Sequence, residues 1–203
     1  MKSEFAKLET NLLQKGYKVH TFDTKEEAAD FVDSQIDGKT VGIGGSATVH
    51  QIKLFPMLAK HNEVYWHAEK PDDLTAMETR RKASSSEVYI SSANGVSENG
   101  EIVNIDNLGN RVAALSFGPS EIYIIIGKNK ICPDLSAAID RARNVAAPLN
   151  AKRLNCKTPC AVKADRCYDC KSPERICRNL SVFYTKPAGA DYHIIIVNED
   201  LGF

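Results

Sequence analysis

The sequence predicts an α/β fold: a mainly parallel sheet flanked by helices, with an inserted antiparallel hairpin. Short apolar runs alternate along the chain with segments whose apolar residues recur every three or four positions. The runs at 122–127 and 192–197 are continuously apolar, as expected for strands buried on both faces of a parallel sheet. Between residues 94 and 119, glycine-containing turns separate short β-branched runs, which is typical of a hairpin.

Two helices are predicted first. Residues 4–16 carry their apolar side chains on one stripe, and Gly16 ends this pattern. The second helix is predicted over 25–36. Thr24 is suited to cap it, and the acidic residues that follow lie where the helix dipole favours negative charge.

Three strands and two helices follow. The run 40–44 predicts a strand that leads through a glycine-rich turn into a helix ending near residue 61. The run 64–66 predicts a short strand, and a helix capped by Asp72 precedes the strand 87–91.

The second half of the chain contains the predicted hairpin, with strands 101–105 and 111–117. A helix is predicted over 133–146, because its apolar residues repeat at helical spacing, and Pro148 is expected to stop it. The two continuous apolar runs complete the sheet.

The length of 203 residues, 43% of them hydrophobic, fits one domain, or one domain with a small appendage. Residues 1–150 are predicted to form the α/β domain. Residues 151–180 have little apolar periodicity and contain most of the cysteines, so a cysteine-rich metal-binding loop is predicted there. Residues 181–203 are predicted to contribute the C-terminal strand that completes the α/β domain.

Charge and hydropathy argue against two classes of partner. The chain has 26 basic and 26 acidic residues, so its net charge gives no electrostatic footprint for nucleic acid. No apolar run approaches the ~20 residues that a membrane span needs, and the first residues lack the apolar stretch of a signal peptide. We therefore expect a cytoplasmic protein, and a homodimer only on the general ground that two-fold dimers are the commonest oligomers.

Five of the six cysteines lie between residues 156 and 177. Their spacing is Cys156-x3-Cys160-x6-Cys167-x2-Cys170-x6-Cys177. In a reducing cytosol, clustered cysteines bind metals or do redox chemistry more often than they form disulfides. Thiolates are soft ligands that suit zinc and iron–sulfur clusters, so the segment predicts a metal centre.

The spacing leaves the kind of metal open. Cys160, Cys167, Cys170 and Cys177 are the ligands predicted for a [4Fe–4S] cluster, with Cys156 left over. Alternatively, Cys156-x3-Cys160 and Cys167-x2-Cys170 are the two knuckles of a structural zinc site, with Cys177 left over. The third possibility is a loop of free or disulfide-prone thiols without metal.

The turn after strand 40–44 predicts a binding site for an anion. Its glycines let a ligand approach the backbone closely, and a helix N-terminus offers free N–H groups to a phosphate or carboxylate. Open α/β sheets also bind ligands beyond the carboxyl ends of their strands. The predicted ligand-binding residues of this turn are Gly44, Gly45, Ser46 and Thr48. The alternative is a tight strand-to-helix connection capped by Ser46.

Two further side chains are candidates. Arg111 is predicted to clamp a carboxylate bidentately, although a solvated charge is the alternative. Glu98 is the predicted catalytic residue, because Ser97-Glu98-Asn99-Gly100 resembles the sequence around the catalytic glutamate of family I coenzyme A transferases, where the carboxylate attacks an acyl thioester. The alternative for Glu98 is a solvated residue beside an Asn-Gly turn.

Several short motifs together resemble the LUD family over about residues 1–200. They are GGSAT at 44–48, NGV at 94–96, ENG at 98–100, NRVAA at 110–114, FGP at 117–119, GKNK at 127–130 and RAR at 141–143. The ending with Cys160, Cys167, Cys170 and Cys177 resembles a cysteine-bearing subgroup, whereas the plain form of the family lacks this segment.

The resemblance implies a fold similar to the superfamily of glucosamine-6-phosphate deaminase, ribose-5-phosphate isomerase and the coenzyme A transferases. It also implies a role in the oxidation of lactate, or a related small 2-hydroxy acid, together with iron–sulfur partner proteins. The resemblance identifies no catalytic residue.

The function that we prefer is that of a subunit of such a redox system. The alternatives are a stand-alone transferase or isomerase that uses Glu98 on an acyl or phosphorylated substrate, and a non-enzymatic assembly or regulatory protein with a structural zinc knuckle.

Overall fold

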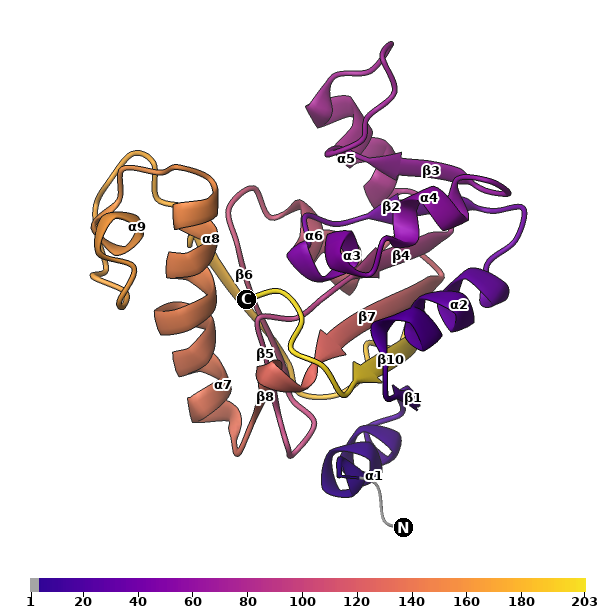
Figure 1. The fold of residues 1–203 in the computed structure, drawn as a ribbon, viewed down its shortest axis with the longest axis horizontal. Coiled ribbons are helices and arrows are strands. Elements are labelled where there is room, and N and C mark those ends of the chain that lie inside the picture. The colour runs from indigo at the N-terminus through magenta and orange to yellow at the C-terminus, as the bar shows by residue number, and fades with distance from the viewer. Residues whose placement is uncertain (1–3) are drawn as a thin grey trace.

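The computed structural model describes residues 4–203, and its centre is a six-stranded sheet in which all neighbouring strands are parallel (Figure 1). In sheet order the strands are β1 (Lys18–Phe22), β10 (Asp191–Val197), β7 (Glu121–Gly127), β4 (Val88–Ser91), β2 (Thr40–Ile43) and β3 (Glu63–Trp66). The predicted α/β fold class with a mainly parallel sheet is confirmed.

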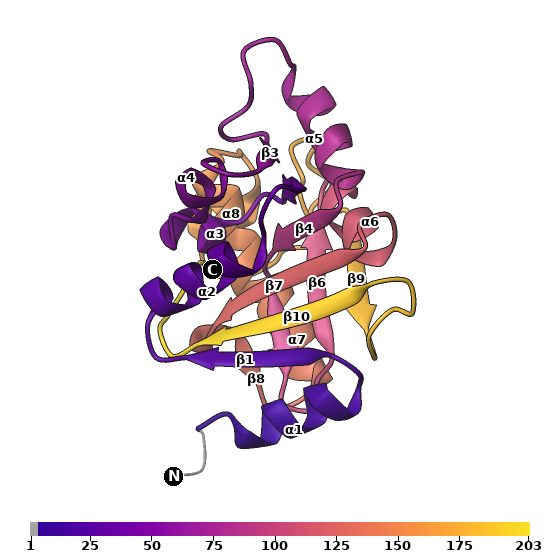
Figure 2. The same cartoon turned by 90° about the vertical axis from the view of Figure 1, so that its right-hand side faces the viewer.

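The two continuous apolar runs form β7 and β10, which lie side by side inside the sheet (Figure 2). Ile124 and Ile194 are paired in register and belong to one hydrophobic core. Ile125 and Ile195 are the next pair and belong to the core on the opposite face. Because side chains alternate between the faces of a strand, both faces must be apolar, and this produces the unbroken apolar runs.

Helices cover both faces of this sheet. One face carries α2 (Lys25–Gln35), α3 (Ala47–Gln51) and α4 (Leu54–Leu58), and the other core includes α1 (Ala6–Gln14), α5 (Ala76–Ser84) and α6 (Asn110–Ser116).

Two predicted helices differ from the observed ones. The single helix predicted up to residue 61 is divided into α3 and α4, because Lys53 between them adopts a left-handed conformation with φ of 55°. The helix predicted to begin at Asp72 begins at α5 instead. There Thr75 and Glu78 form a reciprocal capping box, which satisfies backbone N–H groups that the first helical turn leaves free.

A second, mixed sheet of four strands lies beside the first. In sheet order its strands are β8 (Ile131–Cys132), β5 (Gly95–Ser97), β6 (Ile102–Asp106) and β9 (Asn179–Phe183). β5 and β6 are antiparallel and form a hairpin. The predicted inserted hairpin therefore exists, but it joins 95–97 to 102–106 and not 101–105 to 111–117.

Residues 111–117, predicted as a hairpin strand, instead form most of α6 and its end. Gly109 has φ of 83° and turns the chain at the start of the helix. The Oδ2 atom of Asp106 then accepts hydrogen bonds from the backbone N–H groups of Arg111 at 3.0 Å and Val112 at 3.2 Å. A short apolar run is compatible with both a helix and a strand. Here the hydrogen bonds to Asp106 stabilise the helix.

The prediction that Pro148 ends a helix is wrong, because the helical chain continues to Arg153. α7 (Leu135–Arg141), the π-helical segment η2 (Ala142–Ala146) and α8 (Ala147–Arg153) follow one another without a break. A proline inside a helix lacks an N–H group and crowds the preceding turn. The wider π turn immediately before Pro148 gives its ring room.

Residues 154–178 connect α8 to β9 and contain the short helix α9 (Pro159–Lys163). In Figure 1 this cysteine segment lies beside α8, and the second sheet separates it from the main sheet. The chain then returns through β9 to β10, so the residues from Asn179 onward complete both sheets. Among residues 4–203, no helix combines the length and the apolar composition needed to cross a membrane.

Candidate functional site

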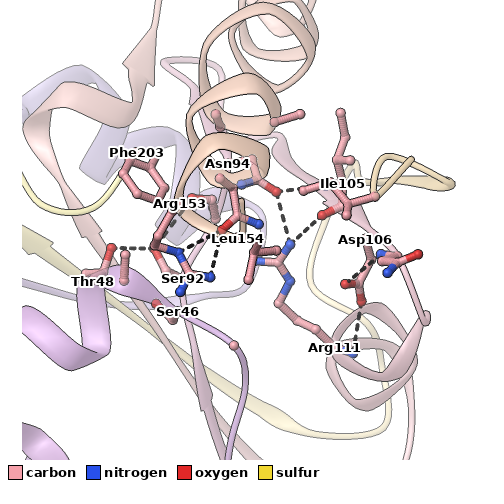
Figure 3. Close-up of a pocket in the computed structure, with 18 of the residues that line it drawn as sticks. Ser46, Thr48, Ser92, Asn94, Ile105, Asp106, Arg111, Arg153, Leu154 and Phe203 are labelled. Atoms are coloured by element: carbon pink, nitrogen blue, oxygen red, sulfur yellow. Dashed lines mark hydrogen bonds between the residues drawn. The ribbon is translucent and has the colours of Figure 1, made fainter. Parts of the chain in front are cut away.

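A cavity of about 200 Å³ lies where the main sheet, the second sheet and α8 meet (Figure 3). Its walls come from the turn after β2 (45–48), the segment after β4 (92–94), the end of β6 with the start of α6 (105–111), Lys130 after β7, and α8 with its flanks (146–154). Three of these segments follow the carboxyl ends of parallel strands, which is where open α/β sheets bind ligands.

The glycine-rich turn contributes Gly45, Ser46 and Thr48 to the lining, whereas Gly44 packs behind it. A Cβ at Gly44 would lie 2.9 Å from both Ser91 Oγ and Tyr89 Oη, so glycine is required there for packing. The helix that follows the turn attracts an anion less strongly than predicted, because α3 has five residues and the predicted helix extends to residue 61. Its Val49 N–H already donates to Ser46 Oγ at 3.2 Å.

Lys130 is a cavity residue that is not among the predicted site residues. Its Nζ atom donates to Thr48 Oγ1 at 2.9 Å and to Ser92 Oγ at 2.8 Å, and the residue is only 3% exposed. Burial lowers the pKa of Lys130 to about 7, and the charges of Arg141 and Arg111 act in the same direction. Near neutral pH, a large part of the Lys130 amine is therefore uncharged.

Arg111, the predicted carboxylate clamp, is a wall of this cavity. Its Nη2 atom donates to Asn94 Oδ1 at 3.1 Å and to the backbone oxygen of Ile105, and Figure 3 shows the guanidinium between these two acceptors. Its buried Nε atom has no hydrogen-bond partner within the described chain. An unpartnered donor in a residue that is 9% exposed is costly unless a ligand or water accepts from it.

Two more arginines and a histidine complete the lining. Arg80 of α5 donates to its own helix backbone at Ala76 O, 3.1 Å away, and Arg153 of α8 donates to Asn150 Oδ1 at 2.8 Å. Burial lowers the pKa of His67 to about 4, assisted by the charges of Arg80 and Arg153. His67 is therefore neutral at physiological pH.

The balance of charge in the cavity is positive. Of the side chains that line it in the described part of the chain, Asp106 is the single acidic one. Its Oδ2 atom is already committed to the backbone at the start of α6. Three guanidinium groups against one committed carboxylate favour an anionic ligand.

Glu98 lies outside this lining, in the turn between β5 and β6. Its side chain is 40% exposed and forms an ion pair with Lys7, with 2.7 Å between Oε2 and Nζ. Its backbone oxygen accepts a hydrogen bond from Asn11 of α1 at 2.7 Å. The structure therefore does not bring Glu98 together with the other predicted site residues.

The five clustered cysteines are free and half-buried in the cysteine segment. Cys167 Sγ accepts the N–H of Asp169 at 3.4 Å and lies 4.0 Å from Arg143 Nη2. Cys160 Sγ lies 3.3 Å from the Thr158 hydroxyl. Over residues 4–203, no three His, Cys, Asp or Glu side chains lie close enough together to hold a metal ion. The described arrangement therefore brings together no complete ligand set from Cys160, Cys167, Cys170 and Cys177 for a zinc ion or a [4Fe–4S] cluster.

The cysteine segment nevertheless contacts the candidate site. Ile176, the residue before Cys177, is part of the cavity lining. Arg175 holds this stretch in place by donating to the backbone oxygens of Cys170 at 2.9 Å and Cys177 at 3.0 Å.

Comparisons with known proteins found one matching family model and one similar crystal structure. A family model, the LUD domain, matches residues 5–197. No curated protein matches the chain. The crystal structure of a DUF162 family protein from Deinococcus radiodurans is similar over 97% of this chain and 98% of that chain, with 13% sequence identity and a TM-score of 0.54. At this identity, the structural likeness shows a shared fold.

Proposed function

The chain belongs to the LUD domain family, which is associated with lactate utilization, and from this premise we propose that it binds a small carboxylate such as lactate in the cavity. The observation that supports the proposal is the charge of the lining. Arg80, Arg111 and Arg153 line a space of about 200 Å³, which is large enough for a three-carbon acid.

Arg111 gives the proposal its most specific support. Its Nη2 atom is held in place by hydrogen bonds to Asn94 and Ile105, and the residue lines the cavity. A carboxylate in the cavity that contacts the Arg111 guanidinium would form a charge-assisted hydrogen bond with it. The guanidinium is thus preorganised, so little side-chain entropy is lost when the ligand binds.

The oxidation of lactate or a related 2-hydroxy acid with iron–sulfur partner proteins is the finer part of the proposal and rests on the family resemblance. A [4Fe–4S] cluster or a zinc ion in the cysteine segment also stays a prediction, and the binding proposal does not depend on it. Iron and sulfide analysis of anaerobically purified protein tests the cluster. A colourless protein without iron contradicts it.

Isothermal titration with lactate, pyruvate and inorganic phosphate tests the binding proposal. We expect Arg80→Met to weaken binding of the preferred anion by about 10-fold or more, because a hydrogen bond to a charged group contributes roughly 1.5–3 kcal/mol. Arg81→Met is the matched control. Arg81 is the next residue of α5 and is exposed outside the lining.

Two results would contradict the proposal. One is the absence of binding for all three anions to the unmodified chain. The other is an equal loss of affinity in Arg80→Met and Arg81→Met, which would indicate a general effect of surface charge and not a site.

A further inference from the structure

Lys130 has a hydrogen-bonding environment that differs from that of an ordinary buried lysine. Buried amines are usually paired with a carboxylate, because an isolated charge is costly away from water. Within residues 4–203, Lys130 forms no ion pair, and its two hydrogen-bond partners are the hydroxyls of Thr48 and Ser92. The charged groups that influence it are the cations Arg141 of α7 and Arg111 of α6.

The hydroxyls must accept from Lys130, because their own protons have other acceptors. The Thr48 hydroxyl donates to the backbone oxygen of Leu201 at 3.4 Å. The Ser92 hydroxyl has acceptors in Thr48 Oγ1 at 3.3 Å and the backbone oxygen of Ala93 at 3.4 Å. A neutral amine has two N–H donors and one lone pair. With both donors directed at the hydroxyls, its lone pair remains free in a residue that lines the cavity.

A desolvated lysine beside other cations is an activated nucleophile toward carbonyl groups. Lowering of the pKa to about 7 by burial keeps much of the amine uncharged near neutrality, which agrees with the hydrogen-bond geometry. The arginines of the same lining supply the binding groups for a carboxylate. An amine nucleophile next to carboxylate-binding groups matches a ligand that has a carbonyl carbon beside its carboxylate.

We propose that Lys130 forms an imine with a 2-oxo acid bound in the cavity; this inference rests on the proposed function and specifies 2-oxo acids among the small carboxylates that the cavity would bind. The Lys130 lone pair attacks the carbonyl carbon, a C–N bond forms, and the carbonyl oxygen leaves as water. The amine gives up both of its protons to that water, and a carbon–nitrogen double bond replaces the carbon–oxygen double bond. The step involves no oxidant or reductant.

The test is reductive trapping on the full chain with pyruvate as the probe. Incubation with pyruvate and borohydride converts an imine into a stable secondary amine, and intact mass followed by peptide mapping locates it. We expect one adduct per chain on Lys130. Lactate, which has no carbonyl, forms no adduct and competes with pyruvate.

Two variants provide the comparison. Lys130→Met is expected to lose the adduct, whereas Lys128→Met is expected to retain it, because Lys128 belongs to the same short helix η1 (Lys128–Lys130) but is exposed. Peptide mapping on the unmodified chain still identifies the modified lysine if Lys130→Met does not fold. An adduct on other lysines only overturns the proposal.

Calorimetry without borohydride separates this inference from the proposed function. If pyruvate and lactate bind but no adduct forms, the imine proposal is overturned and the carboxylate site stands. If no small carboxylate binds, the proposed function fails and the imine proposal fails with it.

Discussion

Gly202 lies so close to the cavity residues that a side chain there would meet polar atoms of Thr48 and Lys130. Its Cβ would be 2.5 Å from Thr48 Oγ1 and 3.2 Å from Lys130 Nζ, and its φ is +63°. Gly38 has the same φ, but a Cβ there would meet no atom of the described chain within 4 Å. Substitution by alanine therefore strains the backbone equally at both glycines, but only at residue 202 does the new side chain also clash with neighbouring atoms.

We expect Gly202→Ala to destabilise the protein more than Gly38→Ala does. The alanine at 38 costs about 1 kcal/mol, because a left-handed conformation disfavours a Cβ. The alanine at 202 has the same backbone cost and also pushes Thr48 and Lys130 out of place. We therefore expect it to weaken anion binding as well. Urea unfolding and calorimetry of both variants measure the two effects. Equal losses of stability with unchanged affinity would show that residue 202 does not support the cavity.

At the scale of residues, the sequence identifies the glycine-rich turn and Arg111 but not Lys130 or Arg80. The turn is visible because a strand, glycines and a helix follow one another locally. The contact between Lys130 and Thr48 joins residues 82 positions apart, and nothing near either residue indicates it. The burial that changes the chemistry of Lys130 is likewise a property of the folded chain.

Helix α6 depends on Asp106, which lies outside the helix and accepts two N–H groups of its first turn. We expect Asp106→Ala to lower the free energy of unfolding by about 1 kcal/mol, as the loss of a capping side chain does, and Asp106→Asn to recover most of it. Asp106→Asn should also tighten anion binding, because it removes the one negative charge of the described lining.

The matched control is Asp134→Ala at the start of α7. Asp134 accepts the N–H of Ala137 at 2.8 Å, so its loss should cost a similar stability, but it does not line the cavity. Thermal unfolding measures the stability of the variants, and calorimetry measures their affinity for the anion. A stable Asp106→Ala would show that Gly109 alone is sufficient to start α6.

At the scale of elements, the inner strands are predictable and several outer ones are not. β7 and β10 are evident in the sequence because both of their faces are buried. β1 is an edge strand with the sequence KVHTF, which has no continuous apolar run and is partly exposed along its length. Its place in the sheet is determined by pairing with β10, a contact that spans most of the chain.

The pH dependence of stability is a property of the whole molecule to which His67 contributes. The folded pKa of His67, about 4, lies below its unfolded value of about 6.5, so the unfolded chain binds the proton more readily. The stabilisation from neutral His67 is therefore present above pH ~6.5 and is lost as the pH falls toward 4. His20 and His193 act in the same direction, and His61 acts in the opposite one.

We expect His67→Gln to flatten the decrease in the free energy of unfolding between pH 7 and pH 5 without abolishing it. His50→Gln is the control, because His50 is exposed on α3. Urea unfolding at several pH values measures the slope. An unchanged slope in His67→Gln would show that this histidine is not desolvated in the native protein.

The sheet order has a consequence for how the molecule is built during synthesis. β10, the last of the described strands to be synthesised, lies between β1, the first of them, and β7. Until β10 is inserted, β1 has no partner in the sheet and β7 presents an open edge, so the nascent chain carries two unpaired strand edges. The residues after β10 also reach the candidate site, because Leu201 accepts a hydrogen bond from Thr48 and Phe203 lines the cavity. We therefore expect the chain to become able to bind its ligand only once β10 is inserted.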